Sequence, residues 1–115
     1  MTYETFSNDV ITFVGGSYQV ISFNIYNLGG DRVISPIIDN VVWDMALYGE
    51  NESLLHKTMN DKEITVDKGT INIVLKGKDT TSFSGLFTHQ LEITDANNEN
   101  FIVDLGQIVI KKKIS

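Results

Sequence analysis

Apolar and polar residues alternate along most of the chain. The clearest example is residues 41–47, where every second position is large and apolar: Val41, Trp43, Met45 and Leu47. Residues 87–94 repeat the pattern, and one face there carries Phe87, His89, Leu91 and Ile93. A period of two residues is that of a half-buried β-strand, and the helical period is nearly absent. The chain is therefore predicted to be all-β.

Seven to nine short strands are expected at regular spacing. They cover residues 10–14, 17–26, 41–47, 54–58, 63–66, 71–75, 87–94 and 101–110. The apolar segment 33–38 contains the single proline, Pro36, and is predicted to be a loop with buried anchors, because proline is excluded from central strands. Many short strands separated by turns predict a sandwich or a barrel.

Glycine, asparagine and aspartate mark the predicted turns. Gly15 and Gly16 are expected to join the first two strands as a hairpin, because glycine adopts positive φ freely. A second hairpin turn is expected at residues 95–98, and a bulge is expected at Gly106.

Length and composition indicate one domain over residues 1–115. The chain has 115 residues, is 42% hydrophobic and contains neither a linker nor a repeat, so one core is expected. It has no cysteine, which fits a reducing cytoplasm or a particle assembled there. No apolar stretch approaches the roughly 20 residues that cross a bilayer, and the N-terminus lacks the features of a signal peptide. No membrane association is expected.

The charge balance argues against nucleic acid as a partner. Fifteen acidic residues against nine basic ones give a formal net charge of -6, which repels a phosphate backbone. The one basic run is Lys111, Lys112 and Lys113, and it is predicted to be a solvated tail or a guard of an edge strand.

No catalytic, cofactor or metal site is predicted. His56 and His89 lie more than thirty positions apart and form no ligand-spaced pair. His89 is expected to be a partly buried histidine with satisfied hydrogen bonds, and His56 is expected to be exposed. Residues 95–99 resemble the start of a calcium loop, but Asn100 and Gly106 stand where that loop needs glycine and glutamate. Seven of the acidic residues fall in predicted turns, where solvation explains them: Asp31, Glu50, Glu52, Asp61, Asp67, Asp79 and Asp95.

The order of strands and turns resembles one known family. The matching segments cover most of the chain: 11–17, 20–25, 41–47, 54–57, 69–75, 78–80, 85–95 and 106–110. The most specific part is a strand followed by an Asp79-Thr80 bend, then Gly85 with the aromatic Phe87 two positions on, and a glycine, Gly106, before the last strand. This series resembles the N-terminal domain of phage baseplate upper proteins, found in tail baseplates of phages that infect Gram-positive bacteria.

The resemblance implies a fold, a function and partners. The fold would be an immunoglobulin-like antiparallel β-sandwich of about 7–9 short strands, in which the Asp79-Thr80 bend carries the chain from one sheet to the other. The function would be that of a non-enzymatic virion structural module of a phage or prophage tail baseplate, assembled in the host cytoplasm. It would anchor receptor-binding proteins through contacts with other baseplate proteins or with further copies, without a cofactor. Apolar positions outside the core alternation are expected at that interface: Val33, Ile34, Ile37 and Ile38.

Two other classes of function stay open. A carbohydrate-binding or adhesin-like sandwich would need exposed aromatic residues, whereas Trp43 is expected in the core. An enzyme would need carboxylates from distant strands to converge, and no motif indicates such a pair.

Overall fold

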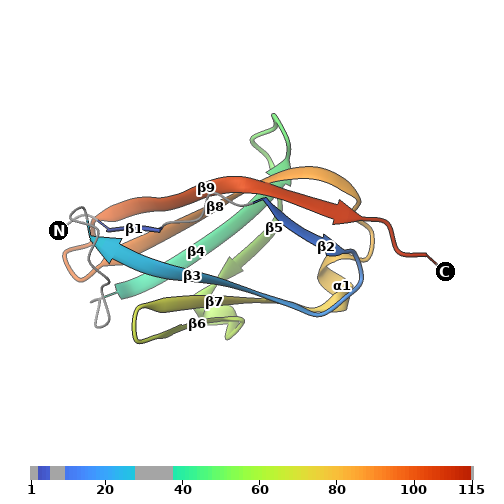
Figure 1. Ribbon diagram of the computed structural model, residues 1–115. Helices are drawn as coiled ribbons and strands as arrows, with labels where there is room; N and C mark the ends of the chain where they lie inside the picture. Colours follow the sequence, from blue (N-terminus) through green and yellow to red (C-terminus); the bar gives the residue numbers. More distant parts are fainter. Residues whose placement is uncertain (1–2, 6–9, 28–37, 115) are drawn as a thin grey trace.

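Two β-sheets packed face to face form a β-sandwich, as the sequence predicts (Figure 1). The structure is a computed structural model, and the residues described are 3–5, 10–27 and 38–114. The long strands run along the molecule, and one hairpin rises from its middle (Figure 1).

The two sheets differ in size. The four-stranded sheet contains, in spatial order, β1 (Tyr3–Thr5), β3 (Gln19–Asn27), β7 (Thr70–Leu75) and β6 (Ile64–Asp67). The five-stranded sheet contains, in spatial order, β2 (Ile11–Val14), β9 (Asn100–Lys111), β8 (Gly85–Asp95), β4 (Ile38–Leu47) and β5 (Ser53–Thr58). A 3-10 turn, η1 (Met59–Asp61), and a one-turn helix, α1 (Gly77–Thr80), connect the sheets. Both are far too short to cross a bilayer, and the described residues contain no other helix.

The core is built by the alternation seen in the sequence. The largest fully buried side chains come from both inner faces: Trp43, Phe87, Met45, Ile25, Ile71, Ile73, Leu75, Leu91, Ile93, Ile108, Ile110 and Val41. The aliphatic and aromatic positions predicted to point inward do so in β4, β7 and β8, apart from Leu47 at the end of β4, which is exposed. Removing these side chains from water supplies the main driving force for folding.

The predicted hairpin at Gly15 and Gly16 is wrong. β2 pairs with β9 in the five-stranded sheet, while β3 pairs with β1 and β7 in the other sheet. The glycines therefore carry the chain from one sheet to the other. A glycine turn indicates a change of direction but does not select the strand that pairs afterwards.

The β2–β9 pair is also parallel, whereas every other pair is antiparallel. The prediction of a wholly antiparallel sandwich is correct except at this edge.

Close packing explains why glycine stands at position 15. A Cβ there would lie 2.9 Å from the carbonyl oxygens of Thr80 and Phe83. The Gly15 N–H donates to the Lys111 carbonyl at 2.9 Å, and the Gly16 N–H donates to Thr80 Oγ1 at 3.0 Å. The crossing therefore lies directly against the α1 segment.

The bulge in β9 is at Val103, not at Gly106. The register shifts between Leu91, which pairs with Asp104, and Glu92, which pairs with Ile102, so Val103 is the extra residue of β9 at the bulge. Gly106 stays in register opposite His89, where a Cβ would lie 2.8 Å from His89 Nε2. Glycine stands at position 106 because the side chain of His89 occupies the space that a Cβ would need.

The other turn predictions are mixed. The hairpin turn after Asp95 is confirmed: Asp95 Oδ1 accepts hydrogen bonds from the N–H groups of Asn97 and Glu99, and Asn98 has φ 63°. The predicted loop 33–38 ends earlier than expected, because Ile38 already belongs to β4. The bend at Asp79 and Thr80 does carry the chain between sheets, but as a helical turn.

The Gly15→Ala variant tests the close approach. We expect a loss of about 1–3 kcal/mol in the free energy of unfolding, because the added methyl group overpacks against two carbonyl oxygens. Urea titration followed by circular dichroism measures it. Gly49→Asn is the matched control, since a Cβ at that position meets no atom within 4 Å and asparagine tolerates its φ of 83°. Equal losses in both variants would contradict the packing argument.

Candidate functional site

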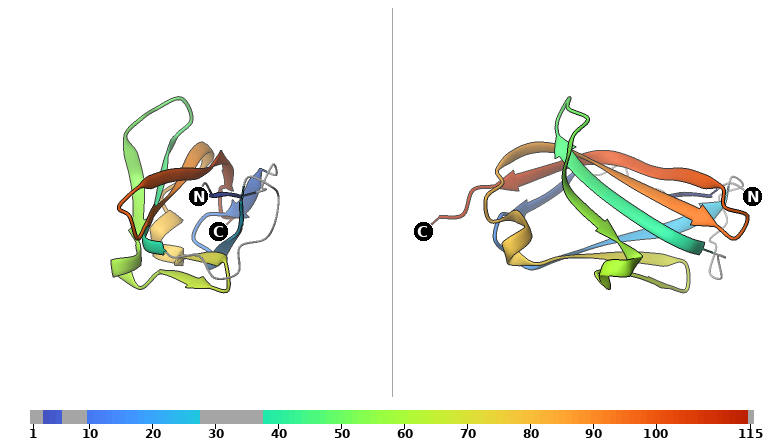
Figure 2. Two further views of the ribbon diagram at one scale, coloured as in Figure 1. Left: turned by 90° about the vertical axis from the view of Figure 1, so that its left-hand side faces the viewer. Right: turned by 180° about the vertical axis from the view of Figure 1, so that it is seen from behind.

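The outer face of the five-stranded sheet carries a hollow of about 240 Å³. Its floor is formed by β4 and β8, the turn of the β4–β5 hairpin forms one wall, and Leu105 of β9 borders the other side. Figure 2 shows this hairpin projecting away from the body of the sandwich. Its volume exceeds the roughly 130 Å³ of another pocket, which lies at the tip of the β4–β5 hairpin.

Strand register aligns the polar groups of this hollow. Asp44 pairs with Gln90 across β4 and β8, and with His56 across β4 and β5, while Gln90 pairs with Leu105 across β8 and β9. Directly paired residues share a face of a sheet, so these four side chains form one row across the outer surface. Asn51 and Glu50 from the hairpin turn add an amide and a carboxylate to the rim.

Asp44, His56 and Ser53 are the residue types of a hydrolytic triad, but they are not connected as one. Ser53 Oγ donates to Asp44 Oδ1 at 2.8 Å, and His56 Nδ1 lies 2.6 Å from the same oxygen. A nucleophilic serine must instead hydrogen-bond the imidazole that takes its proton. In this arrangement the carboxylate binds both side chains, and His56 does not activate Ser53.

Potential metal ligands do not converge in the part of the chain that the structure describes. No group of three or more His, Asp or Glu side chains there is placed to hold a metal ion. The hollow thus offers hydrogen-bonding groups and one apolar border, which suits binding of a polar molecule.

Trp43 and His89 form a hydrogen-bonded pair inside the core. Trp43 is fully buried and His89 is 3% exposed. Trp43 Nε1 donates to His89 Nδ1 at 3.3 Å, so the neutral imidazole carries its proton on Nε2. The predictions for Trp43, His89 and the exposed His56 are confirmed. Because Trp43 is buried, it does not stack on a sugar.

The surroundings of His89 favour its neutral form. Burial lowers the pKa of His89 below its ordinary 6.5, and the negative charge of Asp104 on β9 opposes this shift only in part. Protonation of Nδ1 would also remove the acceptor that Trp43 uses.

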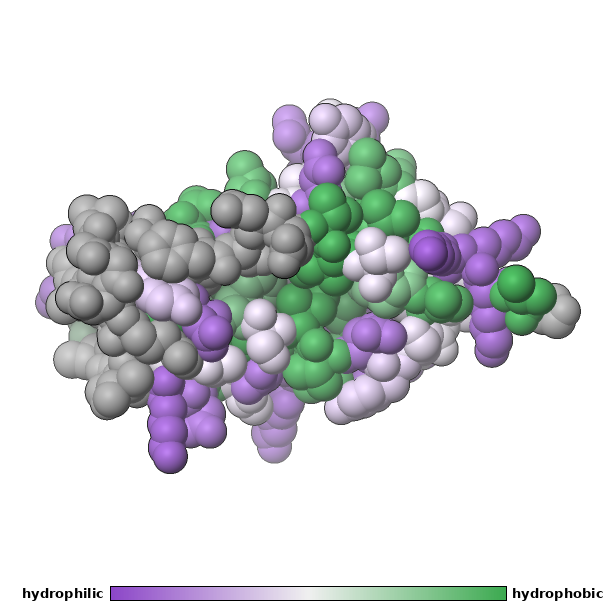
Figure 3. Space-filling view, viewed as in Figure 1, coloured by the Kyte–Doolittle hydropathy of each residue, from purple (hydrophilic) through white to green (hydrophobic). Residues whose placement is uncertain are grey.

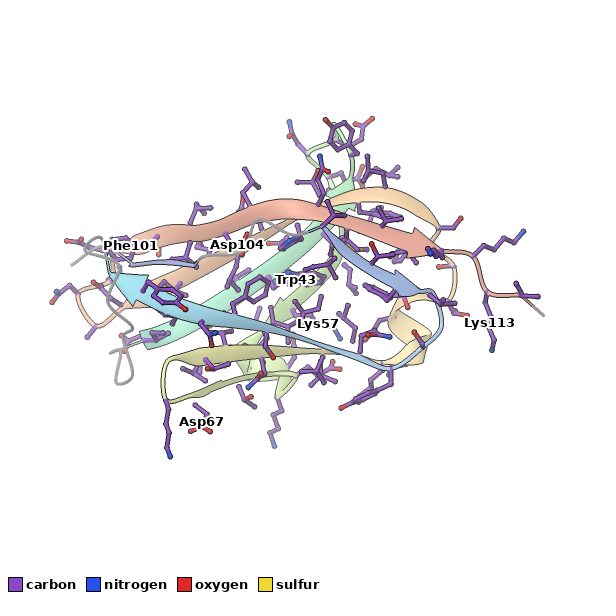
Figure 4. All side chains as sticks on the ribbon, in the orientation of Figure 1. Trp43, Lys57, Asp67, Phe101, Asp104 and Lys113 are labelled. Atoms are coloured by element: carbon purple, nitrogen blue, oxygen red, sulfur yellow. The ribbon has the colours of Figure 1, made fainter. Side chains whose placement is uncertain are left out.

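A buried ion cluster, which the sequence did not predict, joins the two sheets at β5. Lys57 points inward from this edge strand with a side chain only 4% exposed. Its ammonium lies 2.8 Å from Asp79 Oδ2 and 2.9 Å from Glu63 Oε1. Figure 4 shows Lys57 between the sheets, near Trp43. Solvation therefore does not explain Asp79, although its position in a turn suggested so.

The charges within this cluster stabilise one another. Burial alone would lower the pKa of Lys57, but the hydrogen bonds and charges of Asp79 and Glu63 raise it above its usual value. Burial likewise would raise the pKa of Asp79, yet the Lys57 ammonium and the Lys76 backbone N–H hold it below its usual value. The one sequence signal was a lysine at an inward position of a strand, two residues after Leu55.

Large apolar side chains lie exposed on the outer face of β2, β8 and β9. We call Val14, Leu86, Ile102 and Leu105 the apolar strip; Leu105 is 67% exposed. Figure 3 shows apolar surface over β9 and β2. The bulge at Val103 produces part of this strip, because it lets Ile102 and Leu105 face outward although they are three positions apart.

The predicted interface residues are placed only in part. Ile38 opens β4 and is half-buried against the core. Val33, Ile34 and Ile37 lie outside the described residues. Their role at an interface stays a prediction.

Comparison of the chain with protein-family models found no match, and comparison with curated proteins found none either. The resemblance to baseplate upper proteins therefore rests on the residues named above and stays a prediction.

Removing Lys57 should be costly. We expect Lys57→Met to lower the free energy of unfolding by about 3–5 kcal/mol, because it removes the cation that Asp79 and Glu63 share and leaves only Lys76, 3.9 Å from Glu63, beside them. Urea denaturation at pH 7 measures the loss. A triple variant that adds Asp79→Asn and Glu63→Gln is the control and should recover most of it, since no uncompensated charge remains. A small loss in the single variant would contradict the buried cluster.

Acid should weaken the fold through His89. Since the folded state has the lower His89 pKa, the unfolded chain binds more protons below pH 6.5, and the free energy of unfolding falls as the pH drops through this range. Urea titrations at several pH values, followed by emission of the single tryptophan, measure the slope. His89→Leu should flatten the slope, whereas Thr88→Ser, a change at the next position of β8 in a side chain that does not titrate, should keep it. An unchanged slope in His89→Leu would refute the assignment.

Proposed function

We propose that this chain is a non-enzymatic structural module of a phage or prophage tail baseplate, which anchors receptor-binding proteins through protein–protein contacts. The observation that carries the proposal is the apolar strip. Ile102 and Leu105 are exposed neighbours on this face, and Leu86 and Val14 follow beyond the polar pair of Thr88 and Gln107. Exposed apolar surface of this kind is typical of a protein interface. The partner is a baseplate protein that presents an apolar surface to β9.

The strand order supports the immunoglobulin-like part of the proposal. With β3, β7 and β6 as strands B, E and D, and β4, β8 and β9 as C, F and G, the two sheets have the order of an immunoglobulin fold. β5 then lies beside β4 as the additional strand of variable-type domains does. The family resemblance supplies the link to a tail baseplate.

The chemistry of the outer face also supports a binding role. Asp44 holds Ser53 and His56 without activating either, and the hollow beside the strip contains no nucleophile with its base. Asp44, Ser53 and His56 are fixed by these hydrogen bonds and form a polar border beside the apolar strip. Protein interfaces commonly have such a polar rim around an apolar centre.

The test is incorporation of the protein into particles. In a producing strain, the double variant Ile102→Ser with Leu105→Ser should reduce the amount found in purified particles about tenfold or more, because two neighbouring apolar contacts of β9 are lost. Immunoblots of particles and immunogold labelling of tail tips measure this amount. Val20→Ser is the matched control, since Val20 is an exposed apolar residue on the opposite sheet. Absence of the wild-type protein from tail tips, with an accessible epitope, would refute the proposal.

Carbohydrate binding is the second candidate, and the hollow favours it. The side chains of Asp44, Asn51 and Gln90 offer both donors and acceptors to sugar hydroxyl groups. Titration with mono- and oligosaccharides, followed by NMR of the Asn51 and Gln90 side-chain amides, tests it directly. Shifts in these amides would move this candidate to first place.

A further inference from the structure

The tip of the β4–β5 hairpin carries a second, smaller pocket of about 130 Å³. Leu47, Glu50, Glu52 and Leu54 line it, and we call it the hairpin pocket. Two leucines and two carboxylates thus border one concave site. The leucines are almost half exposed, and the neighbouring Tyr48 is also exposed. A ligand that fits this pocket combines an apolar side chain with positive charge.

The chain itself contains a segment of this chemistry. Lys111, Lys112, Lys113 and Ile114 follow one another at the end of β9, and we call them the basic tail. Ile114 is 94% exposed, the most exposed of the large hydrophobic residues in the described part of the chain. Exposure of an isoleucine beside three lysines leaves apolar area in water that a partner would cover.

The positions of the basic tail and the hairpin pocket in the fold indicate that the tail reaching this pocket comes from a second copy of the chain. In Figures 1 and 2 the tail extends beyond one end of the sandwich, whereas the hairpin rises from the middle of the molecule. Figure 4 shows Lys113 pointing away from the body. The tail thus leads away from the hairpin of its own chain.

We propose that the basic tail of one copy docks in the hairpin pocket of another, with Ile114 between Leu47 and Leu54 and the lysines beside Glu50 and Glu52. Opposite charges steer the two surfaces together, and burial of the three aliphatic side chains holds them. The contact is heterologous, because tail and pocket are different surfaces. Successive copies therefore build a ring or an open chain rather than a symmetric pair.

This inference does not depend on the proposed function. The contact with a baseplate protein is assigned to the apolar strip, whereas self-association is assigned to the hairpin and the tail. Variants at Ile102 and Leu105 test the first, and variants at Glu50, Glu52, Lys112 and Lys113 test the second, so each can fail without the other.

The experiment measures self-association of the full chain by analytical ultracentrifugation. The wild-type protein should associate with rising concentration, up to about 1 mM, a range that covers weak specific contacts. The association should weaken when salt is raised from about 0.1 to 1 M, because the screening length falls from about 10 to 3 Å. A wild-type protein that stays monomeric throughout would overturn the proposal.

Charge reversal identifies the two surfaces. One variant carries Glu50→Lys with Glu52→Lys, and the other carries Lys112→Glu with Lys113→Glu. Each alone should associate at least about tenfold more weakly, because both its tail and its pocket then have the same sign of charge. An equimolar mixture should regain association, because the reversed tail fits the reversed pocket. Failure of the mixture to recover would refute the pairing.

A control separates this pairing from an effect of net charge. Asp67→Lys with Glu99→Lys reverses two exposed acids, one at the end of β6 and one before β9, and changes the net charge by the same amount as the hairpin variant. It should associate as the wild type does. Ile114→Ser, which changes no charge, should weaken association as well. Equal effects of the control and hairpin variants would overturn the assignment.

Discussion

The contacts of the α1 segment tie the two sheets together at one end of the sandwich, and the connections around it depend on them. The chain passes between sheets at Gly15 and Gly16, at η1 and at α1 itself. Thr80 accepts the hydrogen bond of the first crossing, and Asp79 binds Lys57 just before the second. A Cβ on Gly77 would lie 2.6 Å from the Gly16 carbonyl oxygen, so the backbones meet almost directly. The four residues of α1 thus contact two other segments of the chain, the crossing at Gly15 and Gly16 and the end of β5.

The sequence predicted the burial pattern well because that pattern is local. Alternation in β4, β7 and β8 decides which side chains point inward, and the core follows from it. The strand that pairs with β2 is instead the one whose edge is open in the sheet, which is β9. The local sequence of β2 contains no information on that edge. The same holds for Lys57: its strand was predicted, but its carboxylate partners come from turns on other elements, and their approach is a property of the tertiary fold.

The candidate surfaces were less predictable than the core. A single extra residue at Val103 changes which side chains of β9 face outward, and a bulge has a weak sequence signal. The polar row across β4, β5 and β8 depends on register between three strands. Both candidate surfaces thus depend on features that arise only when strands pair, and a single sequence does not contain that pairing.

The parallel pairing of β2 with β9 has a consequence for how the chain acquires its structure. Ile11 pairs with Ile108, so β2 cannot pair in the five-stranded sheet until β9, almost a hundred residues later, has been synthesised. During synthesis the sheet stays open at β8 until β9 has left the ribosome, and contacts between such distant residues make folding slow. An open strand edge of this kind readily pairs with other chains. Productive folding therefore depends on keeping that edge covered until β9 has been synthesised and has paired with β8.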